Sequence, residues 1–446
     1  MGSQIPPFLS KVLFGSAVAF ALKFMASVLG FAMFALSSRA MDQHSFGSLA
    51  LAFNALSFLS VVAIAGQETL IMRSWDEYRV SGRPALARGV LIFSAQTSLA
   101  GSLIFFVGTA GVWSLWDRAA SAALVLSGCS FLLAHSLLQF TGQLARVTVD
   151  LISGEAPREF LWRLIVVIVI SGYWWADLEF GAVQFFTICT NAIFIAILFQ
   201  VWHVSRCIPE TVKQARPQYD RATWIARSFR MWISVLLDTT SQYVEVVIVG
   251  LILGPGAAAY YFVITRITNV FAMITGGISV YATSQISALF YGSAKSELQK
   301  VLRALAVISM IISATAVLVI ILGGKMLLWA FGAAYISIYP ALIVMAAGAA
   351  ISTLVGPARH VLLLTGHEGV YARIMAPVLF VRMLLIVVLG PTFGLMGAVI
   401  GWTVSTVIMT FALIVASRCL VGLDPSLAFF IRQRGPNMVG LKKNPP

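Results

Sequence analysis

Two carboxylic acids, Asp238 and Glu245, lie in an apolar stretch long enough to cross a bilayer, residues 231–254 (MWISVLLDTTSQYVEVVIVGLILG). A carboxylate at the centre of a bilayer costs about 3 kcal/mol on insertion scales, so a membrane helix that keeps one calls for an explanation. The acids are two helical turns apart, which places them on one face of a helix. Three further polar side chains complete a stripe on this face: Ser234, Ser241 and Gln242. Such a stripe can bind a proton or a cation, contact sugar hydroxyls, or pair with a buried base.

Four basic side chains also lie well inside apolar stretches: Lys23, Arg266, Arg359 and Arg382. Because a charge facing lipid is costly, each must face a protein interior, a wet cavity or another charge. A Gly-Pro-Gly turn at 254–256 joins the stretch of Glu245 to that of Arg266, and the two residues lie at similar depths from it. Glu245 is therefore expected either to neutralise Arg266 structurally or to stand free for a proton or a sugar, and the residues alone favour neither role.

The basic surplus within these stretches, four against two, suits an anionic cargo such as a phosphate or pyrophosphate head group. Lys23 and Arg266 are the better cavity candidates, whereas Arg359 and Arg382 fit snorkelling or a structural role. Six residues are kept as candidate substrate contacts: Lys23, Gln242, Arg266, Asn269, Arg359 and Arg382. Asp238 and Glu245 are candidates for ion coupling or charge pairing. No cofactor is expected, and coupling to H+ or Na+ stays open.

The composition identifies an integral membrane protein. The chain has 446 residues, of which 59% are hydrophobic and 11% charged, with a mean hydropathy of +0.92. A soluble protein would carry about 25% charged residues. The four cysteines show no spacing typical of a disulfide framework or a metal site. The apolar residues come in long blocks, which predicts transmembrane helices rather than a large soluble core.

We expect an all-α fold with twelve transmembrane helices in two six-helix bundles and both termini cytoplasmic. The fifth span is short and opens with Arg163. The predicted spans are 12–36, 46–66, 89–113, 119–140, 160–176, 182–204, 231–254, 257–289, 304–323, 339–364, 374–390 and 395–417.

The basic residues orient these spans. With a cytoplasmic N-terminus, 23 of the 30 lysines and arginines lie on the cytoplasmic side, and only Arg39, Arg118 and Lys325 lie outside. The other four lie within spans. This count includes Arg158 and Arg163 as residues that follow the fourth span. Such a bias follows the positive-inside rule, and it accounts for the net charge of +13 without a nucleic-acid partner.

The longest polar stretch between spans, 205–230, falls after six spans and before six. This position predicts a duplicated transporter whose halves share an orientation. We place an N-terminal bundle at 1–215 and a C-terminal bundle at 216–446, with a cytoplasmic tail from about 418. The outer loops are short and hold no catalytic pattern, so an enzyme of polysaccharide assembly, such as a polymerase, is disfavoured.

Four stretches resemble the polysaccharide-biosynthesis flippases of the O-antigen and exopolysaccharide type. They are LGPGAAAYYFVITRI (253–267), WAFGAAYISIYPALIV (329–344), LLLTGHEG (362–369) and LGPTFGLMGAVIGWTVS (389–405). These flippases belong to the multidrug/oligosaccharidyl-lipid/polysaccharide (MOP) exporter superfamily, which also holds the multidrug and toxin extruders (MATE) and the lipid II flippases. The similarity in topology extends over most of the chain. The motifs consist of Gly, Pro and aromatic residues at helix ends and do not identify a substrate.

The resemblance implies two MATE-like bundles that rock around a central cavity lined by the first, second, seventh and eighth spans. The implied cargo is an undecaprenyl-pyrophosphate-linked oligosaccharide, flipped from the cytoplasmic to the outer leaflet of the bacterial inner membrane. Other polysaccharide-assembly membrane proteins are candidate partners. Lys23 and Arg266 fall on cavity spans, whereas Asp238 and Glu245 depart from a purely cationic cavity. The alternative is a cation-coupled multidrug extruder of the same fold, which these two acids favour.

Overall fold

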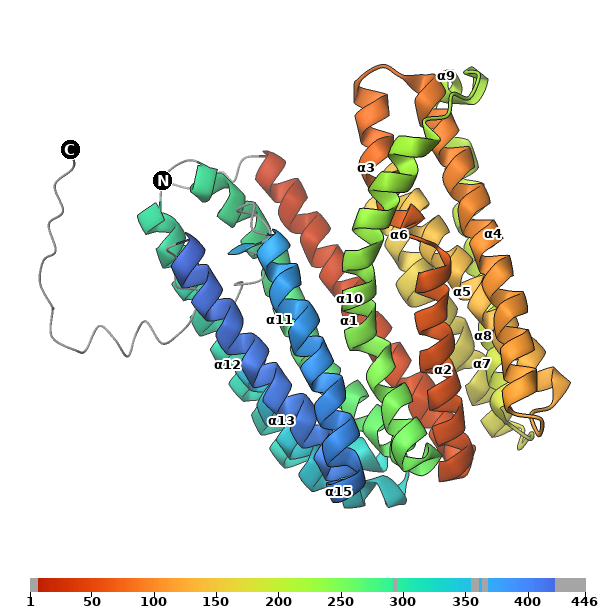
Figure 1. Cartoon of the computed structure of the whole chain (residues 1–446), viewed down its shortest axis with the longest axis vertical. Helices are drawn as coiled ribbons and strands as arrows, with labels where there is room; N and C mark the ends of the chain where they lie inside the picture. The colour runs from red at the N-terminus through yellow and green to blue at the C-terminus, as the bar shows by residue number, and fades with distance from the viewer. Residues whose placement is uncertain (1–6, 292–294, 354–360, 363–367, 422–446) are drawn as a thin grey trace, which may run out of the picture.

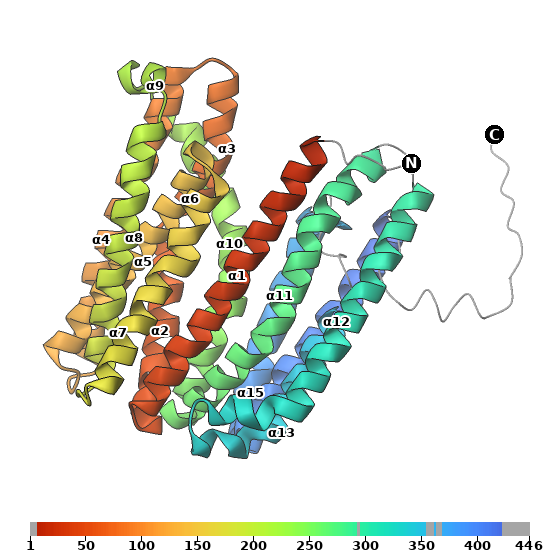
Figure 2. The ribbon, with the colours of Figure 1, turned by 180° about the vertical axis from the view of Figure 1, so that it is seen from behind.

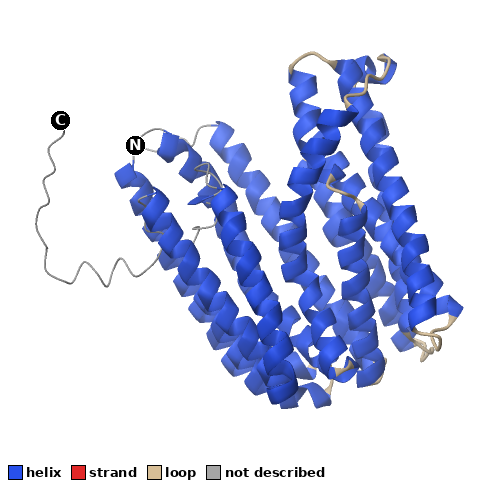
Figure 3. Ribbon diagram, in the orientation of Figure 1, coloured by secondary structure: helices blue, strands red, loops and turns tan. Residues whose placement is uncertain are grey.

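The computed structural model describes residues 7–291, 295–353, 361–362 and 368–421. The regular elements of these residues are all helical, and no strand occurs among them (Figure 3). The first ten are α1 (Pro7–Arg39), α2 (Gln43–Ala63), α3 (Gln67–Val80), α4 (Pro84–Trp116), α5 (Ala122–Thr148), α6 (Leu151–Glu155), η1 (Ala156–Leu161), α7 (Trp162–Trp175), α8 (Ala182–Cys207) and α9 (Glu210–Gln214). The remainder are α10 (Arg221–Leu253), α11 (Pro255–Tyr291), α12 (Lys295–Trp329), η2 (Ala333–Ile338), α13 (Tyr339–Thr353), α15 (Glu368–Ala416) and η3 (Ser417–Val421).

The helices confirm the predicted all-α membrane architecture. Nine helical stretches within the described residues are long and apolar enough to cross a membrane. Within the described residues, each predicted span lies largely in a helix, and the last two share α15; part of the tenth, 339–364, lies outside the described residues. Gly394 interrupts α15 with φ 60° and ψ −143°, so two helices meet at the predicted turn. The count of twelve crossings and the cytoplasmic termini stay predictions.

Two helix groups diverge from a common base (Figures 1 and 2). One group holds α2 to α8, and the other holds α11, α12, α13 and α15. Helices α1 and α10 run between them, and α2 packs against both α10 and α11. The groups meet at the end that carries η2, here the η2 end, and separate toward the end that carries α9, here the α9 end. The predicted division at residues 215/216 stays a prediction.

Close backbone approach joins the two groups near the η2 end. Helix α10 stops at Gly254, whose φ of 86° suits a residue without a side chain, and Pro255 begins α11 directly after it. A methyl group built on Gly47 of α2 would lie 1.8 Å from the Pro255 carbonyl oxygen. Only a glycine at this position therefore lets α2 lie against the start of α11.

Polar contacts at the η2 end add to this packing. Ser38 Oγ donates to the Phe331 carbonyl at 2.8 Å. Arg39 donates through Nε to the Ala330 carbonyl at 2.8 Å and through Nη2 to the Trp329 carbonyl at 2.9 Å. The Trp329 carbonyl is the last of α12 and the other two follow it directly, and a helix C-terminus favours a cation. We call these three bonds the η2-end contacts.

At the α9 end, α10 is anchored to the N-terminal group. The Trp224 indole donates to the Tyr78 hydroxyl at 2.8 Å, and Arg227 binds the Glu77 carboxylate at 2.6 Å. Trp224 is fully buried in an apolar cluster with α3 and α4. Helix α10 thus begins on one group and, lower down, packs against α15 of the other.

Candidate functional site

Arg266 of α11 lies between the two groups in a cage of aromatic rings. Its guanidinium carbon is 4.5 Å from the ring centre of Phe262, 5.2 Å from that of Phe34 and 6.0 Å from that of Phe53. The faces of these rings stabilise a cation. The Arg266 Nε is buried and has no hydrogen-bond partner among the described residues. The cage therefore holds a cation whose donors are incompletely used.

A second arginine, Arg163, comes from the start of α7. Its Nη1 lies 2.9 Å from the Glu159 carboxylate and also donates to the Glu159 carbonyl. Its guanidinium carbon lies 4.8 Å from the Trp162 ring centre. The side chains of Arg163 and Glu159 are 23% and 24% exposed, so this ion pair is not sealed in the core. The Arg163 side chain lies beside Gly30 of α1: a methyl group on Gly30 would be 4.0 Å from its Cδ and Nε atoms.

Electrostatic interactions connect these residues across the boundary between the groups. The charge of Arg163 acts on Arg266, and that of Lys23 acts on Glu159. The charges of Arg266, Arg163 and Glu159 all act electrostatically on the hydroxyl of Tyr243 in α10. We call Lys23, Glu159, Arg163, Tyr243 and Arg266 the interface cluster. It draws on α1, η1, α7, α10 and α11, and its formal charge is +2.

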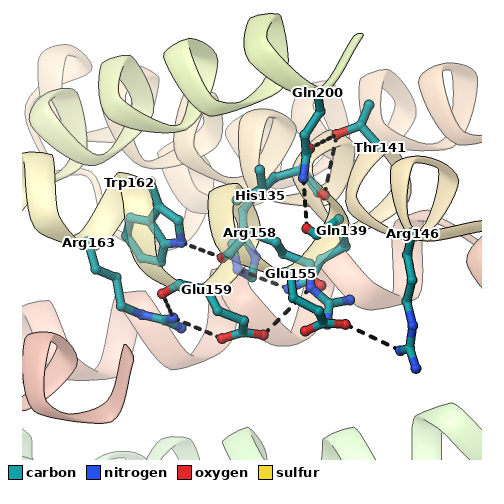
Figure 4. Close-up of polar contacts among 12 residues, drawn as sticks. His135, Gln139, Thr141, Arg146, Glu155, Arg158, Glu159, Trp162, Arg163 and Gln200 are labelled. Carbon is teal, nitrogen blue, oxygen red and sulfur yellow. Dashed lines mark hydrogen bonds and ion pairs between the residues drawn. The ribbon is translucent and has the colours of Figure 1, made fainter. Parts of the chain in front are cut away.

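Figure 4 shows a polar network in the N-terminal group that continues from the Arg163–Glu159 pair to Glu155 and Arg146. Glu155 is 4% exposed and binds Arg158 at 2.8 Å and Arg146 at 3.2 Å. The Trp162 indole donates to the Arg158 carbonyl at 2.7 Å. Both Arg158 and Glu159 lie on the π-helix η1, a geometry common at functional sites.

Hydrogen bonds from neighbouring helices fix this network in place (Figure 4). Gln200 of α8 donates to the Gly154 carbonyl at 3.0 Å and accepts from the Thr141 hydroxyl at 2.7 Å. His135 of α5 lies 2.7 Å from Ser60 and stacks on Phe131. The supporting residues come from three helices, and the bond to the Gly154 carbonyl holds α6, which leads directly into η1.

Arg158, predicted to lie after the fourth span and before the fifth, is part of the helical segment η1, and Arg163, predicted to open the fifth span, lies at the start of α7. The chain is helical from Leu151 to Trp175, so both arginines belong to the helical wall. Arg158 is only 12% exposed at its side chain and bonds to Glu155. Glu155 and Glu159 lower the mean hydropathy of this segment. A prediction of spans from hydropathy therefore does not recognise it as a helix.

Glu245 forms an ion pair, one of the two alternatives left open, but its partner is Arg382 and not Arg266. Arg382 Nη1 lies 2.8 Å from Glu245 Oε1, and Glu245 Oε2 accepts from the Tyr261 hydroxyl at 3.0 Å. Both side chains are nearly buried, at 9% and 5% exposed. Arg382 also donates to three hydroxyls: Ser241 at 3.1 Å, Ser405 at 2.9 Å and Thr406 at 3.2 Å. The pair joins α10 to α15 and is fully hydrogen-bonded on the carboxylate side.

The other predicted site residues differ in their surroundings. Four of them have exposed side chains: Lys23, Asp238, Gln242 and Asn269. Asp238 lies on the same face of α10 as Glu245, nearer the α9 end, and it does interact with the protein. Arg359 lies outside the described residues. No group of His, Cys, Asp or Glu in the described part of the chain could hold a metal ion.

Two pockets, of about 240 and 470 Å³, flank Arg39 at the η2 end. Trp174 lines both, and the larger one lies between the N-terminal group and the loop that follows α12. The interface cluster lies outside both pockets.

No family model matches the chain, and no curated protein matches its sequence. Solved structures match its fold. An inward-facing MATE-family multidrug resistance transporter of the MOP superfamily has a TM-score of 0.74 at 14% identity, over 91% of this chain and 98% of that one.

Two further structures show the same fold. A MOP-superfamily transporter from Pyrococcus furiosus, described by a reversed polarity of its binding pocket, has a TM-score of 0.65 at 12% identity, over 92% of this chain and 96% of that one. The lipid II flippase MurJ has a TM-score of 0.65 at 9% identity, over 90% and 87%. The chain therefore has the fold of the MOP-superfamily transporters.

Proposed function

We propose that this protein flips a polyprenyl-pyrophosphate-linked oligosaccharide from the cytoplasmic to the outer leaflet of a bacterial inner membrane, by alternating access, for surface polysaccharide assembly. The interface cluster carries the proposal. Three cations, Lys23, Arg163 and Arg266, gather where the two helix groups meet, and Glu159 is the carboxylate that acts among them. A pyrophosphate offers the negative charge and the acceptor oxygens that these donors suit.

The arrangement of the helices supports this assignment. The close approach of Gly47 in α2 to Pro255 in α11 joins the groups at one end, where the η2-end contacts also join α1 to α12, while the groups diverge at the other end (Figure 1). A transporter open on one side has this form. A lipid II flippase of the same fold moves a lipid-linked substrate, which makes a related cargo chemically compatible with such a scaffold.

The decisive experiment compares lipid-linked sugars in a deletion strain and its parent. The proposed function predicts that undecaprenyl-linked oligosaccharide accumulates in the inner leaflet and that surface polysaccharide falls. Re-expression of the chain should reverse both changes. Normal polysaccharide together with unchanged glycolipid would refute the proposal.

A second candidate is a cation-coupled multidrug extruder. Asp238, an exposed carboxylate on α10, favours it, and a MATE transporter has the same fold. Drug susceptibility of cells that express Asp238→Asn separates the two functions. Efflux that is present in the parent and lost in this variant, with polysaccharide intact, would favour the extruder.

A further inference from the structure

We infer that Glu159 is an internal competitor of the cargo: it occupies Arg163 in the empty state and releases it to the pyrophosphate when the cargo enters. The inference rests on the proposed function and adds a residue pair to its binding site. Arg163 then becomes a specificity-determining contact from the N-terminal group, opposite Arg266 of the C-terminal group.

The position of Arg163 favours this role. At about 1.5 Å per residue, Arg163 lies roughly 18 Å from the η2-end terminus of α7, and Arg266 lies roughly 16 Å from that of α11. The two guanidinium groups therefore lie at a similar depth, and the charge of Arg163 is near enough to act on Arg266. Two like charges held near each other stabilise a bound anion more than either does alone.

The Arg163–Glu159 pair differs from the ion pairs behind it. Each acid is bound by two arginines, Glu155 by Arg146 and Arg158 and Glu159 by Arg158 and Arg163, but the Glu155 side chain is only 6% exposed, which is typical of a structural group. Glu159 and Arg163 are each about one quarter exposed and face α1, where Lys23 acts on Glu159. A partly exposed pair exchanges partners at lower cost than a buried one, because water or a ligand replaces the lost contact.

Arg163 also keeps its place when Glu159 releases it. Its guanidinium contacts the Trp162 ring, and the Trp162 indole is fixed by the Arg158 carbonyl. The arginine therefore stays pre-oriented, which lowers the entropy cost of binding an anion. The unpartnered Nε of Arg266 is a further donor for the same ligand.

The test measures binding of farnesyl pyrophosphate and of inorganic pyrophosphate to the purified protein in detergent by calorimetry. Glu159→Gln should tighten binding of both, by roughly tenfold, because the competitor loses its charge. Arg163→Gln should weaken it by a similar factor. The matched control is Glu155→Gln, which neutralises a neighbouring acid that does not contact Arg163 and should not tighten binding. Farnesyl monophosphate separates recognition of the pyrophosphate from partition of the lipid chain.

A second measurement uses the unmodified protein and so does not depend on how the variants fold. Phenylglyoxal modifies accessible arginines, and mass spectrometry gives the extent at each site. Pyrophosphate should protect Arg163 and Arg266 and leave the exposed Arg118 unchanged.

The outcomes separate two failures. If the unmodified protein binds no pyrophosphate, both the proposed cargo and the exchange are overturned. If it binds pyrophosphate but Glu159→Gln does not tighten binding, or Arg163 is not protected, the exchange alone is overturned.

Discussion

At the scale of single residues, the two buried charged sites differ in how completely their hydrogen-bonding groups are satisfied. Arg382 is matched by a carboxylate and three hydroxyls, and Tyr261 satisfies the remaining carboxylate oxygen. Arg266 has aromatic faces and an unpartnered Nε. A fully satisfied buried pair stabilises a unique packing, whereas an unsatisfied cation is costly and is typical of a functional site.

Loss of one partner of the Glu245–Arg382 pair should be strongly destabilising. Glu245→Ala leaves the Arg382 charge buried without its counter-ion, at an expected cost of about 3–5 kcal/mol. The double variant Glu245→Leu/Arg382→Met removes both charges and should recover most of that loss. Thermal unfolding in detergent measures both. Equal losses in the single and double variants would show that the uncompensated Arg382 charge is not the cause of the destabilisation.

Arg266→Met should have the opposite effect. The methionine fills the aromatic cage without an uncompensated charge, so the apparent stability should rise by about 1–2 kcal/mol. Restoration of surface polysaccharide in a deletion strain should be lost. Arg266→Lys keeps the cation and should keep part of this activity. A destabilised Arg266→Met protein would indicate that the cage stabilises the fold through the cation itself.

At the scale of elements, the spacing of residues predicts helix faces better than it predicts partners. The stripe on α10 was predictable, because Ser241 and Glu245 recur with the helical period and both bind Arg382. The partner was not, because Arg266 and Arg382 lie on different helices and the sequence does not specify which one faces the stripe. The π-helix η1 was missed because a Pro-Arg-Glu segment has the composition of a loop.

The glycine contact between α2 and α11 gives a test at this scale. Gly47→Ala places a methyl group against the Pro255 carbonyl, and overpacking of this kind costs about 1–3 kcal/mol. Gly108 of α4 has open space around it, so Gly108→Ala should be neutral or stabilising by up to about 1 kcal/mol. Thermal unfolding of the two variants gives the comparison, and equal stability of both would contradict the packing argument.

At the scale of the whole molecule, the contacts between the groups are unequal at the two ends. The η2-end contacts link the end of α1, which runs between the groups, to the end of α12 in the C-terminal group. At the α9 end, the anchors Trp224 and Arg227 hold the start of α10 on the N-terminal group alone. Toward the η2 end, α10 contacts both groups: Gly250 packs against Leu51 of α2, and α15 lies beside the helix. In an alternating-access cycle, α10 would transmit their relative rotation past the interface cluster.

The η2-end contacts should accordingly set the balance between the closed and open forms of this end. Arg39→Gln removes two charge-assisted bonds and the contact with the Trp329 ring, so the open population should rise by roughly tenfold. Spin labels at the exposed positions His44 and Ser337 report the opening as a longer distance in pulsed electron resonance. The control is Arg118→Gln, an exposed arginine after α4. An unchanged distance distribution in Arg39→Gln would show that packing alone, centred on Gly47, holds this end closed.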